Sequence, residues 1–531
     1  MFRDPFHKDV FKAVIILMVI LVGCRFTMGG MAAAVALAGA VFAIQKKPGL
    51  LAVCYIMFPF FTIFNRVITG LGPVFLMTAR LGNLFMIAVM ILTGSAFQSG
   101  GRREKLPITW LFVYCAVACL SSLGGWMPLI SYLKIAQFIL FLMGLLFVTK
   151  QLQQSDKGLY QLRCAFMALA IIMIAGSAAS YFFPSIGFSM QIANSAAYNV
   201  TLTAEDIKAS EGMMLFSGMT HHSQMLAPTI AMMATWVLCD MLLVVKKVSS
   251  LHMVLLALSP ILLFLSRSRG GLLELVGTVG ITLFVCVPRA RLAQTVKNKL
   301  MQMMILATAL LVAVGIVAQI RNQAISKWLR KTEDVGGDTR SLKDAFTGSR
   351  QALVEYNLRD FRRNPFLGMG FQVMEGMEQA YRANMITWYS ASIEKGVTPY
   401  VILGETGLCG ATIFLIFLAA FYGTCLKRRY LALLTSFTCV LVANLADSTL
   451  FSPGGLGGFL WITSCVGAFG TDLIAIRQTH GLWCGPGGGN RPQPPPMGGM
   501  PPPPPRNSGW APRPVPVGNR GILAIGRTQT S

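Results

Sequence analysis

Two arginines interrupt an otherwise apolar stretch, LLALSPILLFLSRSRGGLLELVGTVGITLF, which runs from Leu255 to Phe284. Arg267 and Arg269 each cost free energy near a bilayer, so they serve either to orient the chain or to hold a negatively charged group. A guanidinium group offers a rigid fork of donors that suits phosphate oxygens, and the two following glycines let a ligand approach the backbone. The competing interpretation is that both side chains extend to lipid headgroups.

Further ionisable residues could complete such a site. The segment FSGMTHHSQMLAP places His221 and His222 at the start of an apolar segment, and Glu394 and Lys395 precede another one. Glu405 lies within that second apolar segment, where a carboxylate indicates a function and an arginine is its expected partner. A histidine in such a position can also be structural. We treat the carboxylates and histidines as candidate catalytic groups and Lys395 as a candidate phosphate ligand.

Two more residues could share a pocket with the arginine pair. Glu274 follows one turn into the next predicted helix, and Arg80 lies in the outer half of an earlier predicted span. Asp447, near another outer helix end, is a weaker candidate. Asp240 lies near the predicted inner face, where we expect it to be structural.

The composition indicates the environment of these residues. Hydrophobic residues make up 54% of the chain and charged residues 12%, and the mean hydropathy is +0.61. Soluble domains carry about 25% charged residues, so this chain, with apolar runs along most of its length, is predicted to be a polytopic membrane protein. The net charge of +24 then reflects basic cytoplasmic loops rather than nucleic-acid binding. The 12 cysteines are scattered and form no C-x-x-C pair, so neither a zinc site nor a disulfide framework is expected.

A helix needs about 20 apolar residues to cross a bilayer. The hydropathy pattern predicts transmembrane helices near residues 10–24, 28–44, 50–64, 73–93, 108–124, 127–148, 163–183, 222–245, 251–266, 270–288, 300–319, 397–421, 430–446 and 455–476. The first is interpreted as a transmembrane helix and not as a cleavable signal, because it has no small-residue cleavage pattern. With the N-terminus inside, the inner loops hold more lysines and arginines than the short outer loops do, for example at 46–47, 102–105 and 427–429. Both termini are therefore predicted to be cytoplasmic.

Two outer segments are too long to be simple connections. Residues 184–212 form a short predicted periplasmic loop, and residues 321–396 form a large one. Within the large loop, GSRQALVEYNLRDFRRNPFLGMGF predicts a helix near 346–363 that Asn364 and Pro365 end.

The end of the chain differs from the helical domain predicted at 1–476. Residues 477–531 are rich in proline and glycine and predict a disordered cytoplasmic tail. Such a tail is either a plain tether or a ligand for a cytoplasmic partner that recognises proline-rich segments.

Four segments, taken in order, resemble the O-antigen ligase and polymerase superfamily. They are FSGMTHHSQMLAP, LFLSRSRGGLLEL, GSRQALVEYNLRDFRRNPFLGMGF and EKGVTPYVILGETGLCG, and together they cover roughly residues 216–414. Members of this superfamily are bacterial inner-membrane glycosyltransferases that use undecaprenyl-diphosphate-linked glycans. The resemblance implies an all-α polytopic fold of the C-type glycosyltransferase kind, with about 12–14 transmembrane helices and one long extracytoplasmic loop. Many members begin the last of these segments with a His-Asn pair, where this chain has Gly396 and Val397.

The resemblance also implies a reaction. A glycan would pass from the lipid carrier to a glycan, lipid or protein acceptor at the periplasmic face, in ligation or polymerisation of a surface or extracellular polysaccharide. Arg267, Arg269 and Arg350, with Arg80 and Lys395, would hold the diphosphate, so no metal cofactor is expected. The candidate bases are Glu394, Glu405, His221 and His222. The large loop would close over the site.

Two other functions fit the same composition. A transporter or flippase of lipid-linked oligosaccharide also needs many helices and intramembrane charges, but it usually shows two matched halves. A non-enzymatic membrane scaffold of a polysaccharide export system would use the tail to recruit partners.

Overall fold

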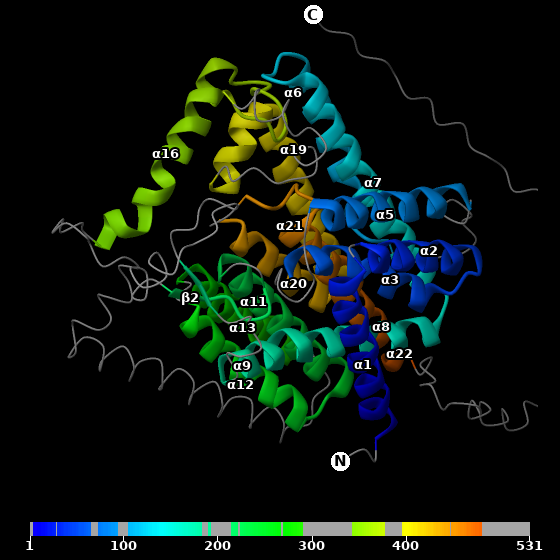
Figure 1. Ribbon diagram of the computed structural model, residues 1–531. Coiled ribbons are helices and arrows are strands. Elements are labelled where there is room, and N and C mark those ends of the chain that lie inside the picture. Colours follow the sequence, from blue (N-terminus) through cyan, green and yellow to red (C-terminus); the bar gives the residue numbers. More distant parts are fainter. Residues whose placement is uncertain are drawn as a thin grey trace, which may run out of the picture. The chain divides into compact units, whose positions relative to one another are not determined.

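The computed structural model describes residues 4–27, 29–64, 73–93, 105–182, 190–192, 214–220, 223–266, 269–289, 342–376, 396–445 and 448–480 (Figure 1). Its first helices are α1 (Pro5–Phe26), α2 (Gly30–Ile44), α3 (Pro48–Ile63), α5 (Pro73–Leu92), α6 (Thr109–Leu123), α7 (Pro128–Leu152) and α8 (Asp156–Ala170). They are followed by η1 (Ile171–Ala175), α9 (Gly176–Phe182), α11 (Ser223–Cys239), η4 (Asp240–Val245), α12 (Ser250–Leu265), α13 (Arg269–Arg289) and α16 (Leu342–Arg363). The last are α19 (Thr398–Arg428), α20 (Leu431–Ala443), α21 (Gly455–Ile462), η5 (Thr463–Ala468) and α22 (Phe469–Thr479).

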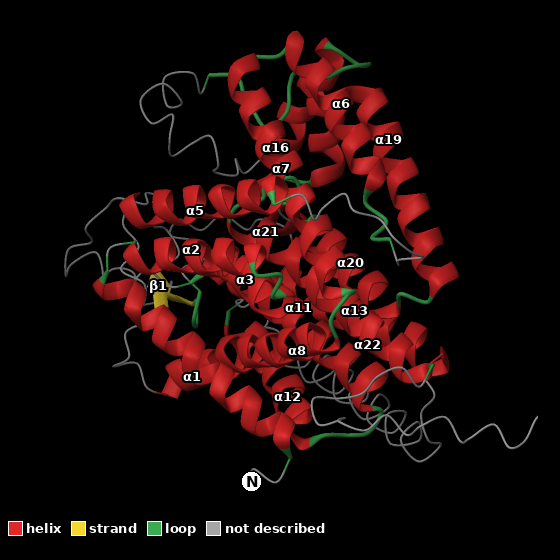
Figure 2. Ribbon diagram, turned by 90° about the vertical axis from the view of Figure 1, so that its right-hand side faces the viewer, coloured by secondary structure: helices red, strands yellow, loops and turns green. Residues whose placement is uncertain are grey.

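The protein is an all-α polytopic membrane protein, as predicted (Figure 2). Five described helical stretches are long and apolar enough to cross a membrane: Pro128–Leu152, Asp156–Phe182, Met225–Val245, Thr398–Arg428 and Gly455–Thr479. The other predicted spans coincide with shorter or more polar helices, except residues 300–319, which lie outside the described residues. The total number of crossings stays a prediction, as does the tail, because residues 481–531 also lie outside the described part.

Three of the long stretches contain a π-helical segment. η1 continues α8 into α9, η4 continues α11, and η5 joins α21 to α22. A π-segment inserts an extra residue into a helical turn and shifts the faces of the helix on either side of it. Hydropathy predicts one helix in each of these places but does not reveal the shift.

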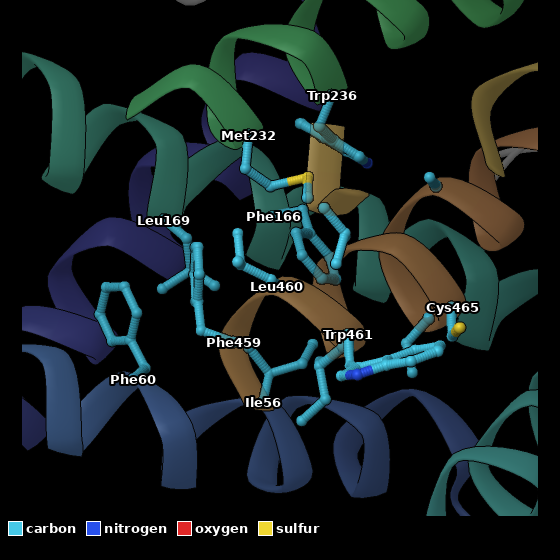
Figure 3. Close-up of a cluster of buried hydrophobic side chains, with 14 of the residues drawn as sticks. Ile56, Phe60, Phe166, Leu169, Met232, Trp236, Phe459, Leu460, Trp461 and Cys465 are labelled. Atoms are coloured by element: carbon cyan, nitrogen blue, oxygen red, sulfur yellow. The ribbon is translucent and has the colours of Figure 1, made fainter. Parts of the chain in front are cut away.

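The core lies where α3, α8, α11 and the α21–η5 helix meet. Figure 3 shows side chains of these helices packed together, with Phe166 beside Trp236 at a ring-centroid distance of 5.4 Å. Trp236 and Trp461 are almost completely buried, and Phe437 of α20 packs on Trp461 at 5.3 Å. Such large aromatic side chains fix how the helices pack, because their volume cannot be accommodated elsewhere without loss of contacts.

A small sheet was not predicted. Strands β1 (Met190–Ile192) and β2 (Met214–Phe216) pair antiparallel, with Met190 opposite Phe216. β1 lies inside the predicted loop 184–212 and β2 follows it. Three-residue strands are too short to show the alternation by which strands are recognised in a sequence.

Asp240 is structural, as expected. It is fully buried at the start of η4, and both its oxygens bind Arg163 of α8, at 2.7 and 3.0 Å. His252 of α12 contacts the same carboxylate at 3.0 Å through Nε2. The guanidinium of Arg163 also lies 4.1 Å from the ring centroid of Phe6. One carboxylate thus joins α8, η4 and α12.

Replacing Asp240 by asparagine should destabilise the protein strongly. The change leaves the mostly buried guanidinium of Arg163 without its charged partner, and breaking a buried pair in this way costs about 3 kcal/mol or more. Thermal unfolding of the purified protein in nanodiscs measures the loss. Lys12→Gln is the control, because Lys12 is 60% exposed and pairs with Asp9 at the surface. Equal melting temperatures for the two variants would contradict the assignment.

Candidate functional site

Helix α16 leads into a glycine-rich loop. The helix covers the segment predicted near 346–363 and ends at Arg363, where Asn364 accepts a hydrogen bond from the Leu367 N–H through Oδ1, at 3.2 Å. The Gly368 N–H bonds the Asn364 carbonyl at 2.8 Å. The turn therefore directs the next residues against α19, on which α16 also packs.

Helix α19 is broken at Gly407, which has φ 60° and ψ −160°. In an unbroken helix the N–H groups of Leu408 and Cys409 would bond the carbonyls of residues 404 and 405. Here those N–H groups donate instead to the carbonyls of Pro365 and Phe366, at 2.8 and 3.1 Å. The break thus leaves two N–H groups of α19 without partners inside the helix, and carbonyl groups of the loop after α16 accept their hydrogen bonds instead.

The loop completes the exchange with its own donors. The Met369 N–H bonds the Gly404 carbonyl at 2.9 Å, and the Gly370 N–H bonds the Glu405 carbonyl at 3.1 Å. Two helical hydrogen bonds are thereby replaced by four between the loop and α19. We call residues 365–370 together with 404–409 the interlock.

Glycine is required where the two backbones touch. Gly368 has φ +71°, and a Cβ added there would lie 2.4 Å from the carbonyl carbon of Glu405. A Cβ on Gly407 would lie 2.4 Å from the carbonyl carbon of Phe366. The sequences PFLGMG, residues 365–370, and ETG, residues 405–407, therefore form the two sides of one backbone contact.

Residues around the turn between α6 and α7 fix the loop from the other side. The Ser121 hydroxyl accepts from the Gly370 N–H at 3.2 Å and donates to the Glu405 carbonyl. Ser131 donates to the Phe371 carbonyl at 3.0 Å, and the buried Lys134 donates to the Gln372 carbonyl at 2.9 Å. Sequence reasoning missed these residues, because each acts on backbone atoms of a segment some 240 residues away and no side-chain pattern reveals that.

A charged and aromatic rim borders the same loop. Arg363 pairs with Glu375 at 3.0 Å, and its guanidinium lies 5.0 Å from the ring centroid of Trp126. Tyr356 accepts a hydrogen bond from the Glu375 N–H at 2.7 Å. Burial raises the pKa of Tyr356 to about 12, so its phenol stays protonated at any physiological pH.

A small pocket lies beside the interlock. Its polar lining comes from Glu405, Thr398, Ser448 and Gln372, and its apolar lining from Val401, Leu450 and Phe451. Glu405 is only 2% exposed, so its side chain lies inside the protein. Gln372 has φ 51°, a strained conformation that is often found at functional sites.

The other predicted site residues are described less completely. Arg269 is the first residue of α13, Arg350 lies in α16, and Arg80 lies in α5. For these three residues the structure describes the position of the backbone only. Because α16 packs on α19, the helix of Arg350 lies against the helix of Glu405. Outside the described residues lie Arg267, His221, His222, Glu394, Lys395 and Asp447.

Glu274 of α13 lies inside the helix bundle. It is 2% exposed, and the Cys439 thiol of α20 donates to its Oε1 at 3.2 Å. Its membership of one pocket with Arg80 and the arginine pair stays a prediction. The diphosphate ligands and the catalytic group, Glu405 included, stay predictions as well.

Residues 253–415 match a protein family described as O-antigen ligase. The match runs from α12 through α13 and α16 to the part of α19 beyond its break. It includes three of the four segments on which the resemblance was based, while FSGMTHHSQMLAP precedes it. The resemblance to this superfamily is thus confirmed. A search of curated proteins found no match to the chain.

Proposed function

We propose, because residues 253–415 match the O-antigen ligase family, that the chain transfers a glycan from an undecaprenyl-diphosphate carrier to an acceptor at the periplasmic face of the bacterial inner membrane. The observation that carries the proposal is the extent of the matched region. It encloses both the arginine pair, Arg267 and Arg269, and the interlock that places Glu405 beside a pocket. The acceptor is a glycan, a lipid or a protein.

The reaction forms one bond, breaks another and transfers one proton. The acceptor oxygen forms a bond to the anomeric carbon, the bond from that carbon to the carrier phosphate breaks, and the lipid diphosphate leaves with an additional negative charge. Fixed guanidinium groups stabilise this developing charge, a task we assign to Arg267, Arg269 and Arg350 with Arg80 and Lys395. The hydroxyl proton of the acceptor goes to a base.

Glu405 is the candidate base that the structure describes. Glu405 is buried and lines a pocket. The hydrogen bonds of the interlock fix the backbone of its helix, so the position of the carboxylate is well defined. A base next to the acceptor hydroxyl typically contributes a factor of about 10² to 10⁴. Glu394, His221 and His222 are the other candidates for the same task.

The substitution Glu405→Gln tests this role. Glutamine keeps the volume and the polar character of the side chain but cannot take a proton, so transfer per folded protein should fall about a hundredfold or more. Glycan transfer by purified protein, measured across a pH series, gives the comparison. Wild-type transfer by Glu405→Gln would move the role to Glu394 or to the histidines.

A cell assay separates glycan transfer from the two other functions. When the chain is removed, a transferase leaves lipid-linked glycan accumulated on the periplasmic face, where an added glycosidase can reach it. A flippase leaves the same glycan on the cytoplasmic face, protected from that enzyme. A scaffold is indicated if a chain in which Arg267, Arg269 and Arg350 are all replaced, present at wild-type amounts, restores polysaccharide completely. Accumulation at the cytoplasmic face would refute the proposal.

A further inference from the structure

Gln372 has a backbone conformation that its position in the chain does not explain. Among the residues that the structure describes, four other than glycine have a positive φ angle: Lys46 (53°), Lys246 (56°), Gln372 (51°) and Arg429 (60°). The other three lie within two residues of the ends of α2, η4 and α19, where a left-handed residue commonly ends a helix. Gln372 follows the loop of the interlock and ends no helix. Its conformation therefore needs another cause.

Two side chains of α7 hold the backbone at this position. The buried Lys134 donates from its ammonium group to the Gln372 carbonyl at 2.9 Å. The buried Ser131, one turn earlier, donates to the Phe371 carbonyl at 3.0 Å. A left-handed conformation costs a glutamine free energy, and such strain persists only where the surroundings impose it. Helix α7 thus imposes the conformation of Gln372 through two successive carbonyl groups.

Lys134 is itself an unfavourable residue at this place. It is 2% exposed and lies in Pro128–Leu152, a helix long and apolar enough to cross a membrane. A charge there is costly, and Ser131 shows that a neutral hydroxyl group can hold the neighbouring carbonyl. A buried charge and a strained backbone therefore meet at Gln372. Features that cost stability in this way gather at functional sites.

Gln372 lies in the wall of the pocket that contains Glu405. Its neighbours Phe371 and Val373 are each 1% exposed, whereas Gln372 is only partly buried. Phe371 packs on Phe451, another residue of the pocket wall, with ring centroids 5.8 Å apart. The buried neighbours thus fix the place of Gln372 in the wall.

A carboxylate and an amide complement each other toward a hydroxyl group. An ionised carboxylate only accepts hydrogen bonds, whereas the amide of glutamine donates through Nε2. A substrate hydroxyl can therefore donate its hydrogen to Glu405 while its oxygen accepts from Gln372. The pocket is small, which suits a single hydroxyl group and not a whole sugar ring. Two such contacts orient the oxygen, and orientation of the reacting atoms lowers the barrier.

We propose that Gln372 orients the acceptor hydroxyl beside Glu405, by a hydrogen bond from its amide, and that Lys134 positions Gln372 for this task. The inference rests on the proposed function and on the role of Glu405 in it. In the reaction the hydroxyl proton passes to the Glu405 carboxylate, and the oxygen bonds the anomeric carbon. Gln372 keeps all its own bonds, so its contribution is orientation alone.

Three substitutions distinguish the effect of the amide from the effect of the strained backbone. Gln372→Gly removes the amide and relieves the strain, because glycine tolerates a positive φ. Gln372→Met removes the amide and keeps both the strain and the length of the side chain. Gln372→Asn keeps an amide on a residue that adopts a positive φ more readily than glutamine does. Melting temperature and glycan transfer are measured for each full-length variant in nanodiscs.

We expect transfer to follow the amide and stability to follow the strain. Gln372→Gly should melt about 1 °C or more above the wild type and transfer at least about tenfold more slowly. Gln372→Met should be equally slow without a gain in melting temperature, and Gln372→Asn should recover part of the rate. The loss should lie in kcat, and KM for the lipid-linked donor should not change, because Gln372 contacts the acceptor.

Lys46→Gly is the matched control. Lys46 has φ 53°, is exposed and follows α2, so glycine there should relieve a similar strain. This variant should gain melting temperature as Gln372→Gly does, and its transfer should equal that of the wild type.

A double-mutant cycle tests the part assigned to Lys134. Lys134→Met alone should slow transfer about as much as Gln372→Gly does, because Gln372 loses a group that holds it. In a chain that already carries Gln372→Gly, the same substitution should slow transfer less than about twofold further. Fully additive losses would show that Lys134 does not act through Gln372. The Gln372 variants alone decide the matter if Lys134→Met does not fold.

Two results would overturn the inference. They are wild-type transfer by Gln372→Gly, and transfer that rises and falls with melting temperature across the variants. Either result leaves the proposed function intact, because the wild type still transfers glycan. Absence of transfer from the wild type would instead refute the proposed function, and this inference with it.

Discussion

Exchange of Arg267, Arg269 and Arg350 for glutamine is expected to lower glycan transfer at least about a thousandfold and to leave lipid-linked glycan undischarged. Removing a single donor that stabilises developing charge typically costs about 10² to 10³ in rate. Three are removed together, and glutamine cannot replace a guanidinium opposite a diphosphate, because it carries no charge and fewer donors. The rate of transfer should therefore fall.

Arg362→Gln is the matched control for this variant. Arg362 is an exposed residue in the last turn of α16, the helix that also contains Arg350. Its loss should change the rate less than about threefold, because an exposed charge contributes little. The measurement is the amount of lipid-linked glycan in membranes that contain equal amounts of each variant. Undiminished transfer by the triple variant would show that these arginines hold no diphosphate.

The substitution Gly368→Ala should inactivate the protein although it adds one methyl group. The new Cβ would lie 2.4 Å from backbone of Glu405, and alanine at φ +71° is strained in addition. The loop must therefore withdraw from the break in α19, which leaves several backbone hydrogen bonds unmade and costs about 3 kcal/mol or more. A displacement of about 1 Å at Glu405 is enough to lower a rate about a hundredfold.

The substitution Gly376→Ala distinguishes the effect of the contact with α19 from the effect of a positive φ angle. Gly376 has φ +79°, but no atom of the residues that the structure describes lies within 4 Å of a Cβ built on it. Both variants carry an alanine with positive φ, and only Gly368→Ala meets the backbone of α19. We expect Gly376→Ala to lose about 1 kcal/mol of stability and to keep its activity. Melting temperature and glycan transfer are measured side by side. If both variants behaved alike, the interlock would have no functional role.

Hydropathy predicts where this chain forms helices, because the bilayer demands long apolar segments whatever their neighbours are. The end of α16 can also be predicted from neighbouring residues, because a proline at 365 disfavours the helical conformation at Asn364. The sequence predicts α19 as one apolar helix, and the break at Gly407 cannot be foreseen. A glycine inside a span is tolerated, and its φ is decided by the loop that bonds to it.

Some residues of the candidate site can likewise be predicted from the sequence, and others cannot. Glu405 can be identified from the sequence because a carboxylate in an apolar segment is rare and costly. Ser121 and Lys134 cannot, because they bind carbonyl groups, which every residue has. Asn83 and Gln137 are amides inside two different predicted spans, and both line one small pocket. Amides cost less than charges in a membrane, so their positions become informative only when helices bring them to one pocket.

The central claim is that this chain breaks the bond between a glycan and its lipid diphosphate. The most direct test places the purified protein in liposomes with a radiolabelled undecaprenyl-diphosphate-linked glycan and an acceptor, and measures the two products. The account predicts one undecaprenyl diphosphate released for each glycan transferred, and neither product with the variant that lacks Arg267, Arg269 and Arg350. Movement of the intact lipid-linked glycan across the bilayer without release of undecaprenyl diphosphate would contradict it.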